Sequence, residues 1–179
     1  MKKTLFLMFF LSSCMSAPQS AFQINPDMDV CLLNVGKIET ISMMSHFDVL
    51  PHIENRLPIS PEQAIIEWTK THLRPSNTSQ DMWIVVHKAE IIQTDLPDPH
   101  FFKLDEVNYT LNYEIEIQLR NQNQLIKKFP VSGTGFITMA KKASLSQKEK
   151  GWAWLIQKML THLKTKIQTD LKDVLISQN

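Results

Sequence analysis

The chain has 179 residues, of which 43% are hydrophobic and 21% are charged, which is typical of a folded globular protein rather than a disordered one. Its formal net charge is only +1 and it contains no block of basic residues, so we exclude nucleic acid as a partner. The length suits a single domain with its own hydrophobic core.

The first 13 residues have the layout of a secretory signal peptide, with two lysines followed by an apolar run at 5–11. This run is far shorter than the roughly 20 apolar residues that span a bilayer, which argues against an uncleaved transmembrane anchor. The tetrapeptide Leu11–Cys14 (Leu-Ser-Ser-Cys) resembles a bacterial lipobox. The resemblance implies that Cys14 is acylated by diacylglycerol and becomes the new N-terminus. The alternative is an ordinary secretory signal with an incidental cysteine.

Residues 14–28 are mostly small, polar or proline, and we interpret them as a lipidated tether with an r.m.s. reach of about 20 Å. Residues 29–179 then form a single α/β domain held near the membrane. Met15 stands where an aspartate favours inner-membrane retention, so the common sorting rule favours the outer membrane, with the domain facing the periplasm. Because Cys14 is expected to carry lipid, Cys31 has no disulfide partner. Its apolar surroundings predict a buried, inert thiol rather than a reactive or intermolecular one.

The first elements of the domain are expected to be a strand and a helix. The continuous apolar run Val30–Val35 predicts a central or doubly covered strand, which continues past a bulge at Gly36. The proline-rich passage that follows favours an extended path. Ser60 as N-cap, with Gln63 as its capping-box partner, then predicts a helix over Pro61–Leu73.

A second strand is expected over Met82–Ile92, with apolar residues on both faces of its first half. Strict alternation places five residues on one face: Trp83, Val85, His87, Ala89 and Ile91. On this pattern His87, like His72 on the preceding helix, is expected to be a hydrogen-bonded core side chain rather than a ligand. The residues from Asp95 to Val107 are expected to form a loop.

The clearest strand has apolar residues at every second position from Tyr109 to Leu119, and its other face is polar. A turn at 121–124 leads to a hairpin partner, Leu125–Ala140, expected to be interrupted near Pro130 and Gly133.

The last element is a long helix that starts at a capping box formed by Ser146 and Glu149. One apolar stripe runs along it: Trp152, Ile156, Met159, Leu163, Ile167, Leu171 and Val174. The order is therefore strand, helix, three strands, helix. It predicts an α+β two-layer sandwich with a mainly antiparallel sheet and both helices on one face.

Catalytic and metal-binding patterns are weak in this sequence. His46, His52 and Glu54 lie close together, but their spacing matches no helical ligand pair or cysteine–histidine site, which favours tail-like or structural histidines. Glu114 and Glu116 share a strand face that is expected to be wet, where charge is usual. We therefore predict no catalytic residue, no metal site and no cofactor.

Two features are candidates for binding. Phe101 and Phe102 lie among prolines and acidic residues in the predicted loop, where they form either a partner contact or a membrane-touching lip. The alternative is that both rings fold back onto the core. The polar face of the hairpin is the second candidate, with a solvated sheet face as its alternative: Thr110, Asn112, Gln118 and Arg120.

From residue 51 to the C-terminal helix, the chain resembles a family of short, uncharacterised envelope lipoproteins of alphaproteobacterial type. The residues that carry the resemblance are Pro51-His52-Ile53-Glu54, Leu57-Pro58, Ser60-Pro61-Glu62, Ala64 and Trp68. They cap and pack one helix, and the resemblance implies no activity. The layout is also similar to the lipoprotein that plugs the lipopolysaccharide-assembly pore and to auxiliary lipoproteins of ABC-type export systems. The chain lacks the Gly-Phe-x-Pro-Leu-Tyr-like opening of the first group.

These patterns favour a non-enzymatic, membrane-anchored lipoprotein that serves as an accessory or assembly subunit of an envelope or transport complex. Its expected partners are the membrane, through the lipid on Cys14, and an envelope protein. One alternative is a carrier or sensor of a small apolar ligand or lipid. Another is an envelope hydrolase, which requires a cleft that joins His52, Glu54 and a serine.

Overall fold

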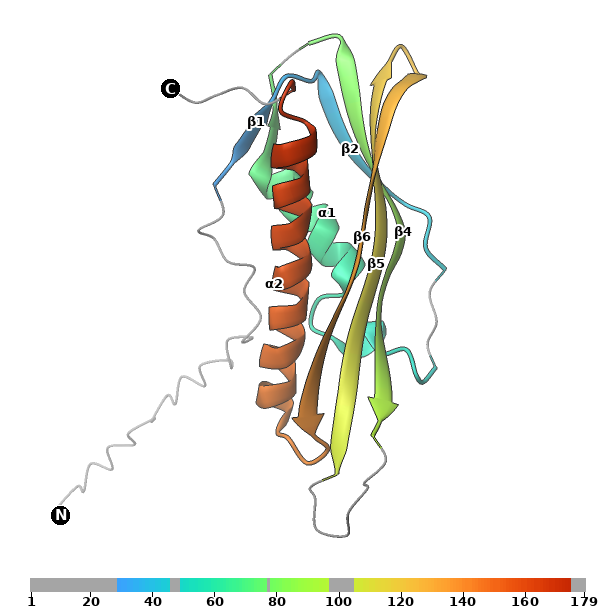
Figure 1. Cartoon of the computed structure of the whole chain (residues 1–179), viewed down its shortest axis with the longest axis vertical. Coiled ribbons are helices and arrows are strands. Elements are labelled where there is room, and N and C mark those ends of the chain that lie inside the picture. Colours follow the sequence, from blue (N-terminus) through green and yellow to red (C-terminus); the bar gives the residue numbers. More distant parts are fainter. Residues whose placement is uncertain (1–28, 46–48, 77, 97–104, 175–179) are drawn as a thin grey trace, which may run out of the picture.

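In a computed structural model of the chain, residues 29–45, 49–76, 78–96 and 105–174 can be described. They form a two-layer α+β sandwich in which the helices α1 (Pro61–His72) and α2 (Leu145–Asp170) lie on the same side of the main sheet (Figure 1). The predicted fold class is confirmed. We call the opposite side of the sheet, which no helix of the described chain covers, the outer face.

The main sheet contains four strands in the order β2-β4-β5-β6. The long strands β4 (Gln80–Asp95), β5 (Glu106–Asn121) and β6 (Gln124–Ala140) are antiparallel, whereas β2 (Lys37–Ser42) pairs with β4 in parallel. The turn between β5 and β6 has positive φ angles at Gln122 and Asn123, as a tight hairpin of two antiparallel strands requires.

The apolar run near residue 30 does not form a central strand, so that prediction is wrong. Its ordered part, β1 (Cys31–Leu33), pairs in parallel with β3 (Leu73–Pro75) in a separate two-stranded sheet. Gly36 separates β1 from β2 rather than forming a bulge within one strand. The run is apolar because Cys31, Leu33 and Val35 are buried in the core. It lies beside the end of α2 and the residues that follow it, where Asn34 N–H donates to the Val174 carbonyl. The Cys31 thiol is buried as predicted, and burial raises its pKa.

The predicted faces of β4 hold only as far as Val86, because the strand contains a β-bulge between Val86 and Lys88. The extra residue changes which side of the sheet each later side chain occupies. His87 is consequently exposed, and its predicted burial is wrong. The residues of β4 that join the main core change from even to odd positions along the strand: Met82, Ile84 and Val86 before the bulge, Ala89 and Ile91 after it. Val85 is buried as well, but it lies outside this core cluster.

The apolar stripe of α2 is buried against the sheet, and six of its seven predicted members are in the core: Trp152, Ile156, Met159, Leu163, Ile167 and Leu171. The helix starts earlier than expected, because Ser144 and Gln147, rather than Ser146 and Glu149, form the capping box. At α1, the Ser60 hydroxyl accepts from Gln63 N–H as predicted. The Gln63 side chain instead donates to Glu67, so this cap lacks its reciprocal bond.

A clasp between the sheet and α2 explains one of the glycines of β6. The buried Tyr113 of β5 makes a 2.6 Å hydrogen bond from its hydroxyl group to Nδ1 of His162 on α2. The Tyr113 ring lies over Gly133, where an added Cβ would come within 2.6 Å of Cζ. The predicted interruption of β6 near Pro130 and Gly133 is wrong, because the strand runs through both. Pro130 is tolerated because β6 is an edge strand.

Replacement of Gly133 by alanine is expected to lower the free energy of unfolding by about 1–3 kcal/mol, because the new methyl group overlaps the Tyr113 ring. Gly135→Ala is the matched control, since its Cβ would meet only Leu155 Cδ2 at an ordinary 3.5 Å. That control should leave stability unchanged or raise it by up to about 1 kcal/mol. Urea unfolding of the two variants measures the difference, and equal stability would contradict the clasp.

Candidate functional site

A pocket lies beside the edge of β4, between two segments that pair with this edge. The β2 side ends where Met43 N–H donates to the Val86 carbonyl at 2.9 Å. Further along, Ile53 N–H donates to the Ile91 carbonyl at 3.1 Å, and Gln93 N–H donates to the Pro51 carbonyl at 2.8 Å. Residues 87–90, which include the bulge, lie between these two stretches and line the pocket. The site therefore exists because the edge of β4 changes partners.

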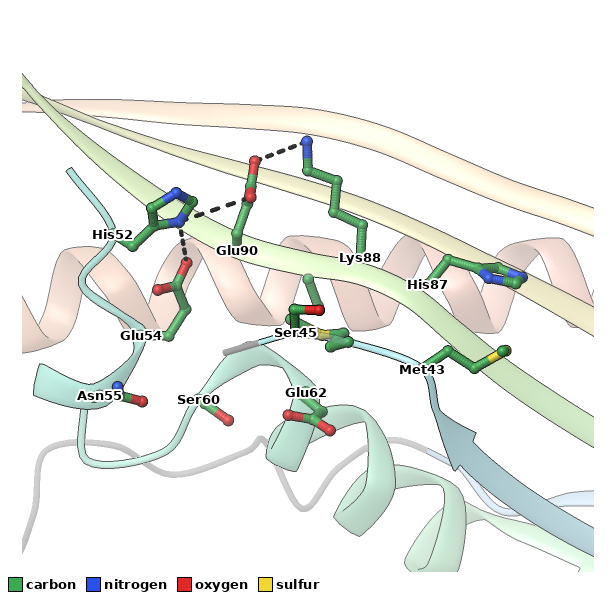
Figure 2. Close-up of a pocket in the computed structure, with 12 residues that line it drawn as sticks. Met43, Ser45, His52, Glu54, Asn55, Ser60, Glu62, His87, Lys88 and Glu90 are labelled. Carbon is green, nitrogen blue, oxygen red and sulfur yellow. Dashed lines mark ion pairs between the residues drawn. The ribbon is translucent and has the colours of Figure 1, made fainter. Parts of the chain in front are cut away.

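The pocket has a volume of about 440 Å³ and its lining is largely polar (Figure 2). Met43, Met44 and Ser45 contribute from the end of β2, and Ser60 from the start of α1. Six ionisable side chains also line it: His52, Glu54, Glu62, His87, Lys88 and Glu90.

His52 lies between two carboxylates at the centre of this group. Its Nδ1 is 3.5 Å from Glu54 Oε1 and 3.8 Å from Glu90 Oε2. Both distances are longer than a good hydrogen bond, so the attraction depends on the positive charge that the imidazole gains when it is protonated. The side chains of all three residues are at most 20% exposed, which weakens screening by water.

The two carboxylates are themselves held in place by further hydrogen bonds. Glu54 Oε1 accepts from Ile91 N–H at 2.7 Å, so the carboxylate takes the position of a strand carbonyl on the edge of β4. Glu90 Oε1 lies 2.8 Å from Lys88 Nζ and accepts from Asn112 Nδ2 at 3.3 Å. The hydrogen bond that the Lys88 ammonium group donates to Glu90 raises the pKa of Lys88, which therefore stays charged at neutral pH.

Three carboxylates against one ammonium group give the pocket an excess of negative charge, which suits hydrogen-bond donors and cationic groups. The described residues contain no group of three or more His, Cys, Asp and Glu side chains placed to hold a metal ion. The pocket does bring His52 and Glu54 together with two serines, as the hydrolase hypothesis requires. However, the Ser60 hydroxyl caps α1, and the second ring nitrogen of His52 points away from Ser45 (Figure 2). The described residues of this pocket are therefore not arranged as a catalytic triad.

The structure places only some of the residues singled out from the sequence. Cys14, His46, Phe101 and Phe102 lie outside the described residues. His72 is buried as expected; its ring stacks on Trp68 and its Nδ1 is 2.6 Å from the Thr71 hydroxyl.

The polar strand face predicted from the sequence is the outer face of the sheet, and its side chains bond to one another. Asn112 Oδ1 accepts from the Thr134 hydroxyl at 3.0 Å, and Asn108 Nδ2 donates to the Thr110 hydroxyl at 3.1 Å. Glu116, on the same face, accepts from Gln118 and is 3.1 Å from Lys128 Nζ; these two contacts lower its pKa. The charge of this face can therefore be explained without a catalytic pair of Glu114 and Glu116.

Sequence reasoning missed two aromatic residues on the outer face. Phe136 of β6 is 67% exposed and lies opposite Thr110. Trp83 of β4 lies beneath Arg120, whose guanidinium carbon is 4.0 Å from the centroid of the indole ring. The alternation of β6 was the available signal, because its odd positions face the helices and Phe136 is even.

Comparison with known proteins gives only distant similarity. No protein-family model matches the chain, and no curated protein matches it. A minor lipoprotein from Acinetobacter baumannii has 16% identity and a TM-score of 0.47, over 82% of this chain and 99% of that one. An uncharacterised lipoprotein B from Nitrosomonas europaea has 10% identity and a TM-score of 0.49, over 80% and 89%. The rare lipoprotein B from Shewanella oneidensis has 10% identity and a TM-score of 0.37, over 76% and 97%.

These identities and TM-scores carry neither a family nor a function over to this chain. In the described part of the chain, no helix is long and apolar enough to cross a membrane.

Replacement of Glu54 by alanine is expected to lower the free energy of unfolding by about 1.5–3 kcal/mol, because Ile91 N–H loses a charged acceptor. Glu54→Gln keeps an acceptor oxygen and should lose less. Glu106→Ala removes an exposed carboxylate elsewhere and should change stability by less than about 0.5 kcal/mol. Chemical denaturation compares the three variants, and equal values for Glu54→Ala and Glu106→Ala would contradict this role of Glu54.

Proposed function

We propose that the protein is a lipid-anchored lipoprotein of the bacterial cell envelope. Its domain faces the periplasm, with the outer membrane favoured, and acts as a non-enzymatic accessory or assembly subunit of an envelope complex. The anchor is inferred from the lipobox-like Leu11–Cys14. The observation that carries the binding role is the outer face of the sheet, where three strands of 16 or 17 residues have both helices on their other side (Figure 1).

The composition of the outer face supports contact with a protein. Aromatic residues and arginine are enriched at the centres of protein interfaces, and Phe136, Trp83 and Arg120 lie on this face. The hydrogen bond between Asn112 and Thr134 already fixes neighbouring polar side chains. Side chains that are ordered before binding lose less conformational entropy when a partner docks.

The alternative role as a carrier of an apolar ligand has less support. The layer between sheet and helices is filled by large, fully buried side chains, including Trp68 and Tyr109. The pocket beside β4 is lined mainly by charged and polar groups, which are costly to desolvate against an apolar ligand.

The proposed anchor depends on a single thiol, so Cys14→Ser is expected to leave the precursor unprocessed and unlabelled by radioactive palmitate in growing cells. Cys31→Ser is the matched control, because that thiol is buried in the folded domain, and this variant should be processed and labelled normally. Palmitate in the Cys14→Ser protein would contradict the proposed anchor.

The proposed partner contact predicts a position-dependent photo-crosslink in intact cells. A crosslinking amino acid at Phe136 or Thr134 should give the same discrete adduct with one envelope protein, because both positions lie on the outer face. The control position is Gln63, which is exposed on α1 in the helical layer and should not give this adduct. Recovery of monomer alone at Phe136 and Thr134, or the same adduct from Gln63, would count against the outer face as the interface.

A further inference from the structure

The exposed side of α2 carries an amphipathic surface that the fold itself does not use. We infer that three residues of α2, Lys150, Trp154 and Lys158, contact the anionic phospholipid headgroups of the membrane that holds the protein. We call these residues the lysine–tryptophan stripe. The inference rests on the proposed lipid anchor, and it assigns a second point of membrane contact and an orientation to the domain.

The three residues are spaced four apart, so they form one line along the helix. Trp154 is 48% exposed, whereas Trp152, two residues earlier, is 5% exposed and packs in the core. Lys158 Nζ lies 5.1 Å from the centroid of the Trp154 ring. The stripe therefore points away from the sheet and presents an indole ring together with ammonium groups. This pairing is typical of protein surfaces at a membrane–water interface.

The charge around the stripe is complementary to anionic lipid. The segment from Lys141 to Lys158 contains five lysines and one acidic residue, Glu149. Only Lys141 has an acidic partner outside this segment, Asp95, at 2.8 Å among the described residues. The other lysines provide a positive surface at the N-terminal half of α2.

The position of the tether brings the stripe near the membrane. The described domain begins at Asp29, whose carboxylate is 3.5 Å from Lys164 Nζ on the same helix. Trp154 lies ten residues before Lys164, about 15 Å along the helix axis. The tether expected over residues 14–28 has an expected r.m.s. reach of about 20 Å. It joins the described domain at Asp29, on the same helix as the stripe, so the proposed lipid anchor and contact of the stripe with the same membrane are compatible.

The orientation that follows has a consequence for the rest of the molecule. When α2 rests on headgroups, the helical layer separates the sheet from the membrane (Figure 1). The outer face, with Phe136 and Trp83, then points into the periplasm, where a soluble or membrane-anchored subunit can reach it.

The test uses the complete mature lipoprotein, reconstituted into vesicles whose acyl chains are brominated and quench tryptophan fluorescence. The vesicles contain either phosphatidylcholine alone or three parts of it to one part of phosphatidylglycerol. Quenching is expected only with phosphatidylglycerol, and high salt should reverse it because headgroup attraction is screened. Trp154→Phe should abolish the quenching, since Trp68 and Trp152 are buried and Trp83 lies on the outer face.

The charge contribution is tested with the double variant Lys150→Gln and Lys158→Gln. Each lysine near an anionic surface changes the equilibrium by about fivefold, so the ratio of docked to undocked protein should fall by about 25-fold. Lys70→Gln on α1 is the matched control, because it removes one exposed helical lysine outside the stripe and should leave quenching unchanged.

Three results would overturn the inference: equal quenching in phosphatidylcholine alone, unchanged quenching in the double variant, or quenching that persists in Trp154→Phe. The last result would place Trp83 and the outer face against the membrane.

Palmitate labelling of the same preparations tests the anchor separately. Labelled but unquenched protein would overturn the contact of the stripe while leaving the anchor intact. Unlabelled protein whose sedimentation with the anionic vesicles depends on Trp154 would support the contact of the stripe and contradict the anchor.

Discussion

The packing of α2 against one face of the long sheet is the contact on which the rest of this fold depends. The helix buries a continuous stripe from Trp152 to Leu171 against β5 and β6, and each large apolar side chain contributes about 1.5–3 kcal/mol when it is fully buried. The Tyr113–His162 hydrogen bond joins the same two layers. Because α1 lies in this layer as well, one face of the sheet is buried and the other is open to solvent. The outer face and the lysine–tryptophan stripe are therefore on opposite sides of the domain.

Elements with long, regular periodicity could be predicted from the sequence. The β5–β6 hairpin and α2 each repeat their pattern over 16 residues or more, and their burial is one-sided, so alternation and helical spacing have a single solution. The run at Val30–Val35 is too short to show a periodicity. Its apolar character predicts burial but does not indicate which element packs against it. In β4, the bulge at His87 moves each later side chain to the opposite face of the sheet from the one that strict alternation predicts. No residue type at this position indicates a bulge.

The pocket beside β4 could not be predicted, because its parts meet only through backbone pairing. Segments 43–45, 52–54 and 87–90 converge where β2 leaves the edge of β4 and the chain near Ile53 rejoins it. His52 and Glu54 are neighbours in the sequence, but Lys88 and Glu90 belong to the later strand β4, and no sequence pattern connects them with His52. The hydrogen bond from Ile91 N–H to the Glu54 carboxylate explains why an acidic residue is needed in this proline-rich segment, at the start of the short 3-10 helix Glu54–Arg56.

The two-layer architecture also determines how a tethered domain can work at a membrane. A sheet covered by helices on both faces would have no open strand face left for a partner. Here the first described residue, Asp29, lies beside Lys164 of α2, on the helical side of the domain. Phe136 and the Asn112–Thr134 hydrogen bond lie on the outer face, on the other side of the sheet. If the proposed lipid anchor holds, the chain that leads to the anchor joins the domain on the side away from the proposed partner surface.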